Sequence, residues 1–127
     1  LKDFNDIIEA PRGWKWKDEW VVDDVLYTHG NGFSGMYATR RMLLAHMRSV
    51  VHGHTHGNAG IIHIQVNKIK SVMGMNAGCL IDAEAYAFDY AKYLAVKPSL
   101  GAGVITDGTM QWLPMKLGKT GKWIGRI

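Results

Sequence analysis

The histidines are the residues of this sequence whose type and spacing point most directly to chemistry. Three of the six lie in the segment His52-Gly53-His54-Thr55-His56. Imidazole is the commonest protein ligand for borderline divalent metals. A Gly-His-Thr-His turn after a short apolar strand brings two imidazoles close together, and its glycine lets the backbone approach a metal or a phosphate. The segment therefore predicts a metal site.

Other kinds of protein also pair their histidines. Histidine-triad hydrolases place bulky apolar residues between them, whereas Gly53 and Thr55 stand there in this chain. Cupin metal sites follow His-x-His with a glutamate, whereas residues 57–60 carry no acid. A surface loop that is rich in histidine and binds no ligand is the remaining alternative. We expect three further histidines to be structural or to lie in the core: His46, His52 and His63.

Two histidine motifs follow one another along the chain. Tyr27-Thr28-His29-Gly30 comes first, and Gly53-His54-Thr55-His56 follows after a predicted helix. In this order and spacing they resemble the fourth and fifth motifs of calcineurin-like metallophosphoesterases, which are a lone His at a strand end and Gly-His-x-His. Residues 72–82 and 101–115 are similar to the strands that follow in that family, and the chain resembles its phage-encoded branch. The first three family motifs (Asp-x-His, Gly-Asp-x-x-Asp and Gly-Asn-His) are absent from these 127 residues.

The resemblance implies a metal-dependent phosphoester hydrolase, either a phosphatase or a phosphodiesterase, with two divalent metal ions. By that resemblance, His29 and His54 bind one ion and His56 binds the other. Manganese, iron, zinc and nickel all suit such ligands. The Gly30 amide and Asn31 are candidate contacts for a substrate phosphate, and no catalytic side chain is assigned to this chain. The substrate class stays open between monoesters, diesters, nucleotides and nucleic acid.

The residues that complete such a site are implied to come from elsewhere. The chain starts at Leu1 and lacks the family carboxylates, so we expect it to be the C-terminal half of an enzyme. On this view it is inactive without an N-terminal half or a companion chain. Missing strands leave unpaired sheet edges, so a homo-oligomer is also expected. The alternative is a catalytically incomplete fragment or module that acts in binding or assembly.

The elements that position these residues follow from apolar periodicity and turn signals. We predict a helix over 1–10, an edge strand around 14–20, a strand over 20–28 that is divided at 23–24, a helix over 36–48 and strands over 49–52, 61–66 and 69–75. A helical or irregular segment over 83–94 and a hairpin over 104–113 complete the series. Residues 20–52 predict a βαβ unit. The predicted fold class is α/β: the C-terminal half of a two-sheet sandwich with outer helices.

Three tryptophans lie close together near the start of the chain: Trp14, Trp16 and Trp20. Trp14 and Trp16 alternate with lysines, a pattern that favours an edge strand with one buried face. We therefore expect the three rings to pack in the core. The alternative is a surface on which a base or another ring stacks.

Composition limits the class of protein. With 127 residues, 47% apolar and 20% charged, the chain is expected to be a single soluble domain spanning 1–127. It has no apolar run long enough for a membrane span. The single cysteine excludes an intrachain disulfide and fits a cytoplasmic location. The net charge of +4 equals the four cations of the basic tail 116–127, which is either solvated or binds phosphate backbones.

Overall fold

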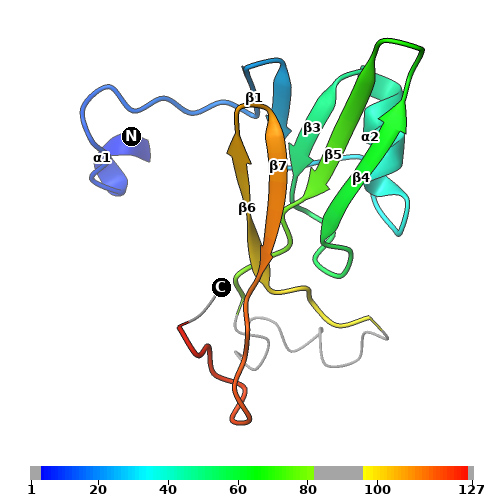
Figure 1. Ribbon diagram of the computed structural model, residues 1–127. Helices are drawn as coiled ribbons and strands as arrows, with labels where there is room; N and C mark the ends of the chain where they lie inside the picture. Colours follow the sequence, from blue (N-terminus) through cyan, green and yellow to red (C-terminus); the bar gives the residue numbers. More distant parts are fainter. Residues whose placement is uncertain (1–3, 82–95, 126–127) are drawn as a thin grey trace.

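The computed structural model of the protein describes residues 4–81 and 96–125. It is mixed α/β, with a five-stranded sheet and a two-stranded sheet (Figure 1). The elements are α1 (Phe4–Ile7), β1 (Glu19–Val22), β2 (Val25–Thr28), α2 (Ala38–His46), β3 (Ser49–His52), β4 (Gly60–Gln65), β5 (Ser71–Asn76), β6 (Gly101–Thr106) and β7 (Thr109–Pro114). None of the helices in the described ranges has the length and apolar run that crossing a bilayer requires.

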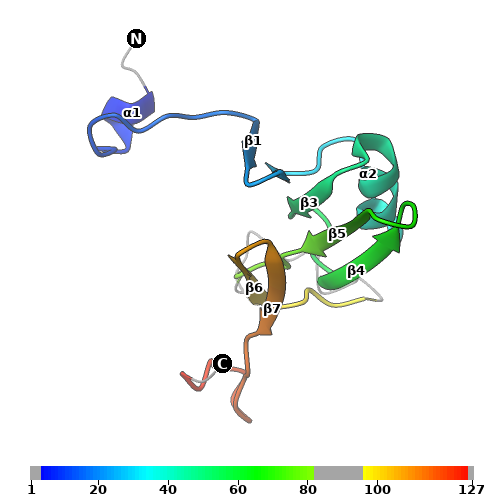
Figure 2. The same cartoon turned by 45° about the horizontal axis from the view of Figure 1, so that its top comes forward.

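The five-stranded sheet has the strand order β1-β2-β3-β5-β4. Its three central strands, β2, β3 and β5, are parallel, and the two outer strands pair antiparallel with their neighbours. The predicted βαβ unit is confirmed as β2, α2 and β3. Helix α2 packs on one face of this sheet, and the β6–β7 hairpin packs on the other (Figures 1 and 2).

Apolar residues along the central strands divide between the two faces, because successive side chains of a strand point to opposite sides. On the face that α2 covers, Leu26, Val50 and Val72 pack against Met42 and Leu43. On the other face, the buried core is Val25, Met75 and Met110, together with half-buried residues of the strands and hairpin. Burial of both faces explains why these strands carry nearly continuous apolar runs.

Two predicted turns are confirmed. Asp23 and Asp24 have φ of 50° and 60°, so the run over 20–28 folds into the hairpin of β1 and β2. Asp107 and Gly108, with φ of 47° and 73°, close the hairpin of β6 and β7. Left-handed backbone at both central residues is what a two-residue hairpin turn requires.

The edge strand predicted around 14–20 is wrong for most of its length. Strand β1 begins at Glu19, and Trp14 and Trp16 lie in an irregular segment where they are 53% and 52% exposed. The Phe4 and Trp16 rings meet edge-on with centroids 5.0 Å apart. This N-terminal segment extends away from the sheet (Figures 1 and 2), so its alternating side chains face no second layer. The prediction that the three rings lie in the core is therefore also wrong, since Trp20 on β1 is 39% exposed as well.

Other predicted boundaries shift for local reasons. Of the helix predicted over 1–10, the structure describes residues 4–10, and α1 covers the first four of them. Helix α2 ends at His46 because Met47 adopts a left-handed conformation with φ of 48°. Strand β5 begins at Ser71 because the Asn67 side chain accepts the Ile69 and Lys70 backbone N–H groups and holds them in a turn. The segment predicted over 83–94 lies outside the described residues.

Candidate metal site at the carboxyl edge of the sheet

The three parallel strands end at one edge of the sheet. Their last residues, Thr28, His52 and Asn76, are neighbours in register across β2, β3 and β5. The arrowheads of β3 and β5 point to this same edge in Figure 1. The loops that follow carry His29 and His54, so two histidines that are distant in sequence meet here. In open α/β sheets, ligands bind outside the carboxyl ends of the strands.

His29 and His54 face each other at this edge. His29 Nε2 lies 3.1 Å from His54 Nδ1, and the ring centroids are 5.0 Å apart at an interplanar angle of 75°. Two nitrogens that each lie about 2.0–2.1 Å from one ion are about 2.9 Å apart at a right angle and about 3.4 Å apart at the tetrahedral angle. The observed separation falls between these values, so the pair fits one metal ion as neighbouring ligands. Without a metal, one ring N–H can donate to the other ring nitrogen.

His54 has a left-handed backbone conformation with φ of 64°. This conformation is unfavourable for a residue with a Cβ, and surrounding contacts must hold it. Thr55 supplies one such contact, because its N–H donates to the Gly53 carbonyl at 2.7 Å. The strained turn directs the His54 ring toward His29.

Asn76 fastens the loop that carries His54. Its side chain is 0% exposed, and Nδ2 donates to both the carbonyl and the hydroxyl oxygen of Thr55 at 2.7 Å. Its Oδ1 accepts the Gly78 N–H at 3.0 Å. The sequence pattern marks Asn76 only as the end of a strand. One sequence signal could have identified Asn76. It is an amide side chain directly after a buried apolar run, and a buried amide must find hydrogen-bond partners.

His52 lies beneath the site, and the prediction that it belongs to the core is confirmed. It is 2% exposed. Its Nδ1 lies 2.7 Å from the Gly53 carbonyl and its Nε2 lies 2.7 Å from the Thr39 hydroxyl. A carbonyl only accepts, so these partners assign the proton to Nδ1, and Nε2 accepts the hydroxyl hydrogen. Burial lowers the pKa of His52 below 6.5, and the nearby His54 and His29 lower it further.

The remaining predicted site residues are placed differently. The Gly30 amide donates to the Thr28 hydroxyl at 3.2 Å, so this group already has a partner. Asn31 is exposed next to His29. His56 is half-buried, and its carbonyl accepts the Ser99 N–H at 2.7 Å. Within residues 4–81 and 96–125, no group of three or more His, Cys, Asp or Glu residues could hold a metal ion. The structure therefore brings His29 and His54 together without adding His56 to them.

The described residues form two sizeable grooves, and His29 lines one of them. One has a volume of about 650 Å³ and is lined by Lys17, Asp18, Glu19, Trp20, Tyr27, Thr28, His29 and Asn31. The other, of about 600 Å³, lies between the start of α2 and the start of β4, where Tyr37, Arg40 and Asn58 are among its lining residues. A ligand bound at His29 therefore has room in the first groove, whereas neither His29 nor His54 lines the second.

Comparison with known proteins leaves the site to be judged on its own geometry. No model of a protein family, no curated protein and no solved structure matches this chain. The residues at the carboxyl edge of the sheet, and the two motifs that supply them, are therefore the guide to function.

Proposed function

We propose that this protein is a metal-dependent phosphoester hydrolase of the calcineurin-like type, and that this chain is the C-terminal half of its catalytic domain. The observation that carries the proposal is the 3.1 Å separation of His29 Nε2 and His54 Nδ1 at the carboxyl edge of parallel strands. The order of the two histidine motifs along the chain supports the same proposal. Imidazole pairs with this separation suit manganese, iron, zinc or nickel.

The chain's own residues hold and orient the metal ligands. A bound ion would supply Lewis acidity and a water of lowered pKa. His29 and His54 would hold that ion as neutral ligands, because a protonated imidazole has no free lone pair. Asn76 and Thr55 fix the loop of His54. Because burial lowers the pKa of His52, a neutral His52 would add no positive charge near the bound ion.

This chain supplies only part of the proposed two-metal site. A second ion would require His56 together with carboxylates, and the described residues hold no such group. We therefore assign the remaining ligands to an N-terminal half or to a companion chain. On its own, the chain would bind one ion weakly and would show negligible turnover. No catalytic side chain is assigned to these residues.

A non-catalytic module that acts in binding or assembly is the second candidate function. The observation in its favour is the apolar N-terminal segment, in which Phe4, Ile7, Trp14 and Trp16 are all more than half exposed. Strand β1 is the edge of the sheet, and all four of its residues are exposed. A companion chain or a second copy of this chain would bury both features.

The test is manganese-dependent hydrolysis of p-nitrophenyl phosphate and of its bis-ester by the natural gene product that contains these residues. With His54→Ala, we expect the rate to fall at least about a hundredfold, because a metal ligand is lost. His63→Ala is the matched control, since His63 is exposed on β4 and is expected to leave the rate unchanged. Hydrolysis no faster than in manganese alone would contradict the hydrolase and leave the binding module.

A further inference from the structure

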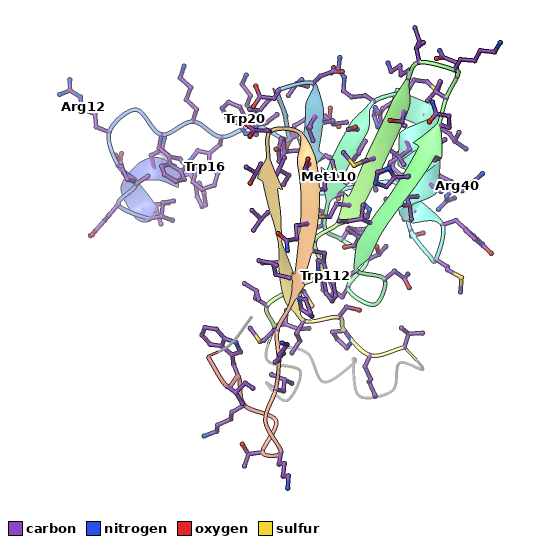
Figure 3. The ribbon with its side chains drawn as sticks, in the orientation of Figure 1. Arg12, Trp16, Trp20, Arg40, Met110 and Trp112 are labelled. Atoms are coloured by element: carbon purple, nitrogen blue, oxygen red, sulfur yellow. The ribbon has the colours of Figure 1, made fainter. Side chains whose placement is uncertain are left out.

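The groove beside His29 combines aromatic rings with charges of both signs. Trp20 and Tyr27 are directly opposed across β1 and β2 and both line it. Lys17, Asp18 and Glu19 line the same groove, and His29 and Asn31 stand at the metal site. Its volume of about 650 Å³ lies within the range of small-molecule sites. Trp20 lies where the N-terminal segment joins the sheet, apart from Trp16 (Figure 3).

The Trp20 ring lines the groove and is partly exposed. Trp20 is 39% exposed, and the Lys17 ammonium lies 4.7 Å from the centroid of its ring. A cation at this distance is attracted by the ring face, so Lys17 covers one face of the indole and a base would stack on the other. Tyr27 is half-buried and packs against the core, so it forms a fixed wall of the groove.

The charges select among ligands. A ligand that is anionic throughout would be repelled by Asp18 and Glu19, which leave only part of the groove suited to a phosphate. The neutral end of a nucleotide avoids that repulsion, because its ring stacks on an aromatic side chain. Its exocyclic amino group can donate to a carboxylate. The phosphate of the same molecule would then lie toward His29.

We infer that this groove is a nucleobase subsite and that the ester cleaved at the metal site belongs to a nucleotide. The inference rests on the proposed function, because His29 joins the groove to the metal site. Among the substrate classes open to the sequence, it selects those with an aromatic base beside the scissile phosphate. It also gives Trp20 a role distinct from that of Trp14 and Trp16.

The experiment compares binding of AMP and of ribose 5-phosphate to the full 127-residue chain by isothermal titration, with a chelator and then with manganese. We expect AMP to bind at least about tenfold more tightly, since stacking of a base is worth that factor. Trp20→Ala should remove the difference, and Trp20→Phe should retain most of it. Trp16→Ala is the matched control, because Trp16 is exposed but lies outside the groove.

Equal binding of AMP and ribose 5-phosphate would overturn the inference, as would an AMP preference that survives Trp20→Ala. A measurement on the unaltered chain covers the case in which Trp20→Ala fails to fold. There we expect nuclear Overhauser contacts between the adenine protons and the Trp20 indole, and contacts to Trp14 or Trp16 alone would contradict the subsite. Loss of manganese binding in His54→Ala would support the metal site, and it is measured separately from the preference for AMP. Manganese binding that survives in His54→Ala would reject the metal site and leave the stacking result standing.

Discussion

The two faces of the five-stranded sheet are packed in different ways. On the face under α2, six of the described residues form a buried cluster: Leu26, Ala38, Met42, Leu43, Val50 and Val72. On the face under the β6–β7 hairpin, the buried cluster among residues 4–81 and 96–125 is Val25, Met75 and Met110, surrounded by half-buried residues. Figure 3 labels Met110 and Trp112 of the hairpin, which pack toward the sheet.

Each face of the sheet holds a different part of the candidate site. The α2 face holds His52 through the Thr39 hydroxyl, directly beneath the loop of His54. The hairpin face holds the loop after β5, because Trp112 Nε1 donates to the Ala77 carbonyl at 3.1 Å. Helix α2 therefore fixes His52 below the loop of His54, whereas the hairpin fixes the loop that follows β5.

The strongest test of this contrast truncates one buried side chain on each face. Leu43→Ala should lower the free energy of unfolding by about 3–5 kcal/mol, because Leu43 is 1% exposed in close packing. Met110→Ala, at 6% exposure under the hairpin, should cost about 2–3 kcal/mol. Urea unfolding followed by circular dichroism measures both values. A larger cost for Met110→Ala would reverse the assignment of the two faces.

A smaller effect comes from adding one methyl group on each side. A Cβ at Gly74 would lie 2.5 Å from Thr39 Cγ2 and 2.9 Å from Leu43 Cδ1, so Gly74→Ala should cost about 1–3 kcal/mol. A Cβ at Gly103 would meet the flexible end of Met75, which can move aside. Gly103→Ala should therefore cost less than about 1 kcal/mol.

The melting temperatures of Gly74→Ala and Gly103→Ala, measured beside that of the parent chain, show which face of the sheet loses more stability. Equal losses would mean that the hairpin packs as rigidly as α2. Gly53→Ala is the control for added bulk at the site, because nothing lies within 4 Å of its Cβ position.

The smallest expected effect is a dependence of the free energy of unfolding on pH. It concerns only the face of the sheet that α2 covers. The pKa of His52 is lowered in the folded protein relative to 6.5, so between that lowered pKa and 6.5 the unfolded chain binds more protons. The free energy of unfolding should therefore fall as the pH drops below 6.5 and level off below the folded pKa. Imidazole titration by NMR and urea unfolding in chelator measure the two quantities. A His52 midpoint at or above 6.5 would contradict a neutral His52 under the site.

Much of the fold follows from the sequence because its signals are local. The division of the run over 20–28 at Asp23-Asp24 and the Asp107-Gly108 hairpin both depend on turn chemistry alone. The βαβ unit over 20–52 also follows, and with it the approach of His29 and His54 at one sheet edge. The prediction for Trp14 and Trp16 fails because alternation indicates a buried face only where a second layer covers it.

The finer parts of the site depend on contacts between distant residues, which local patterns do not encode. The bonds from Asn76 to Thr55 and from Thr39 to His52 require the register of β3 and β5 and the placement of α2. The chain makes a left-handed turn at His54, and among the described residues His56 does not join His29 and His54 in a metal-holding group. The apolar pattern of β3 carries no signal for that turn.

The most direct measurement of the central claim is a manganese titration of the chain followed by histidine imidazole NMR signals. We expect the His29 and His54 resonances to broaden first and together, those of exposed His63 to be spared, and His54→Ala to weaken the broadening at His29. Uniform broadening of all the imidazole signals, or none at His29 and His54, would contradict a metal site at this pair.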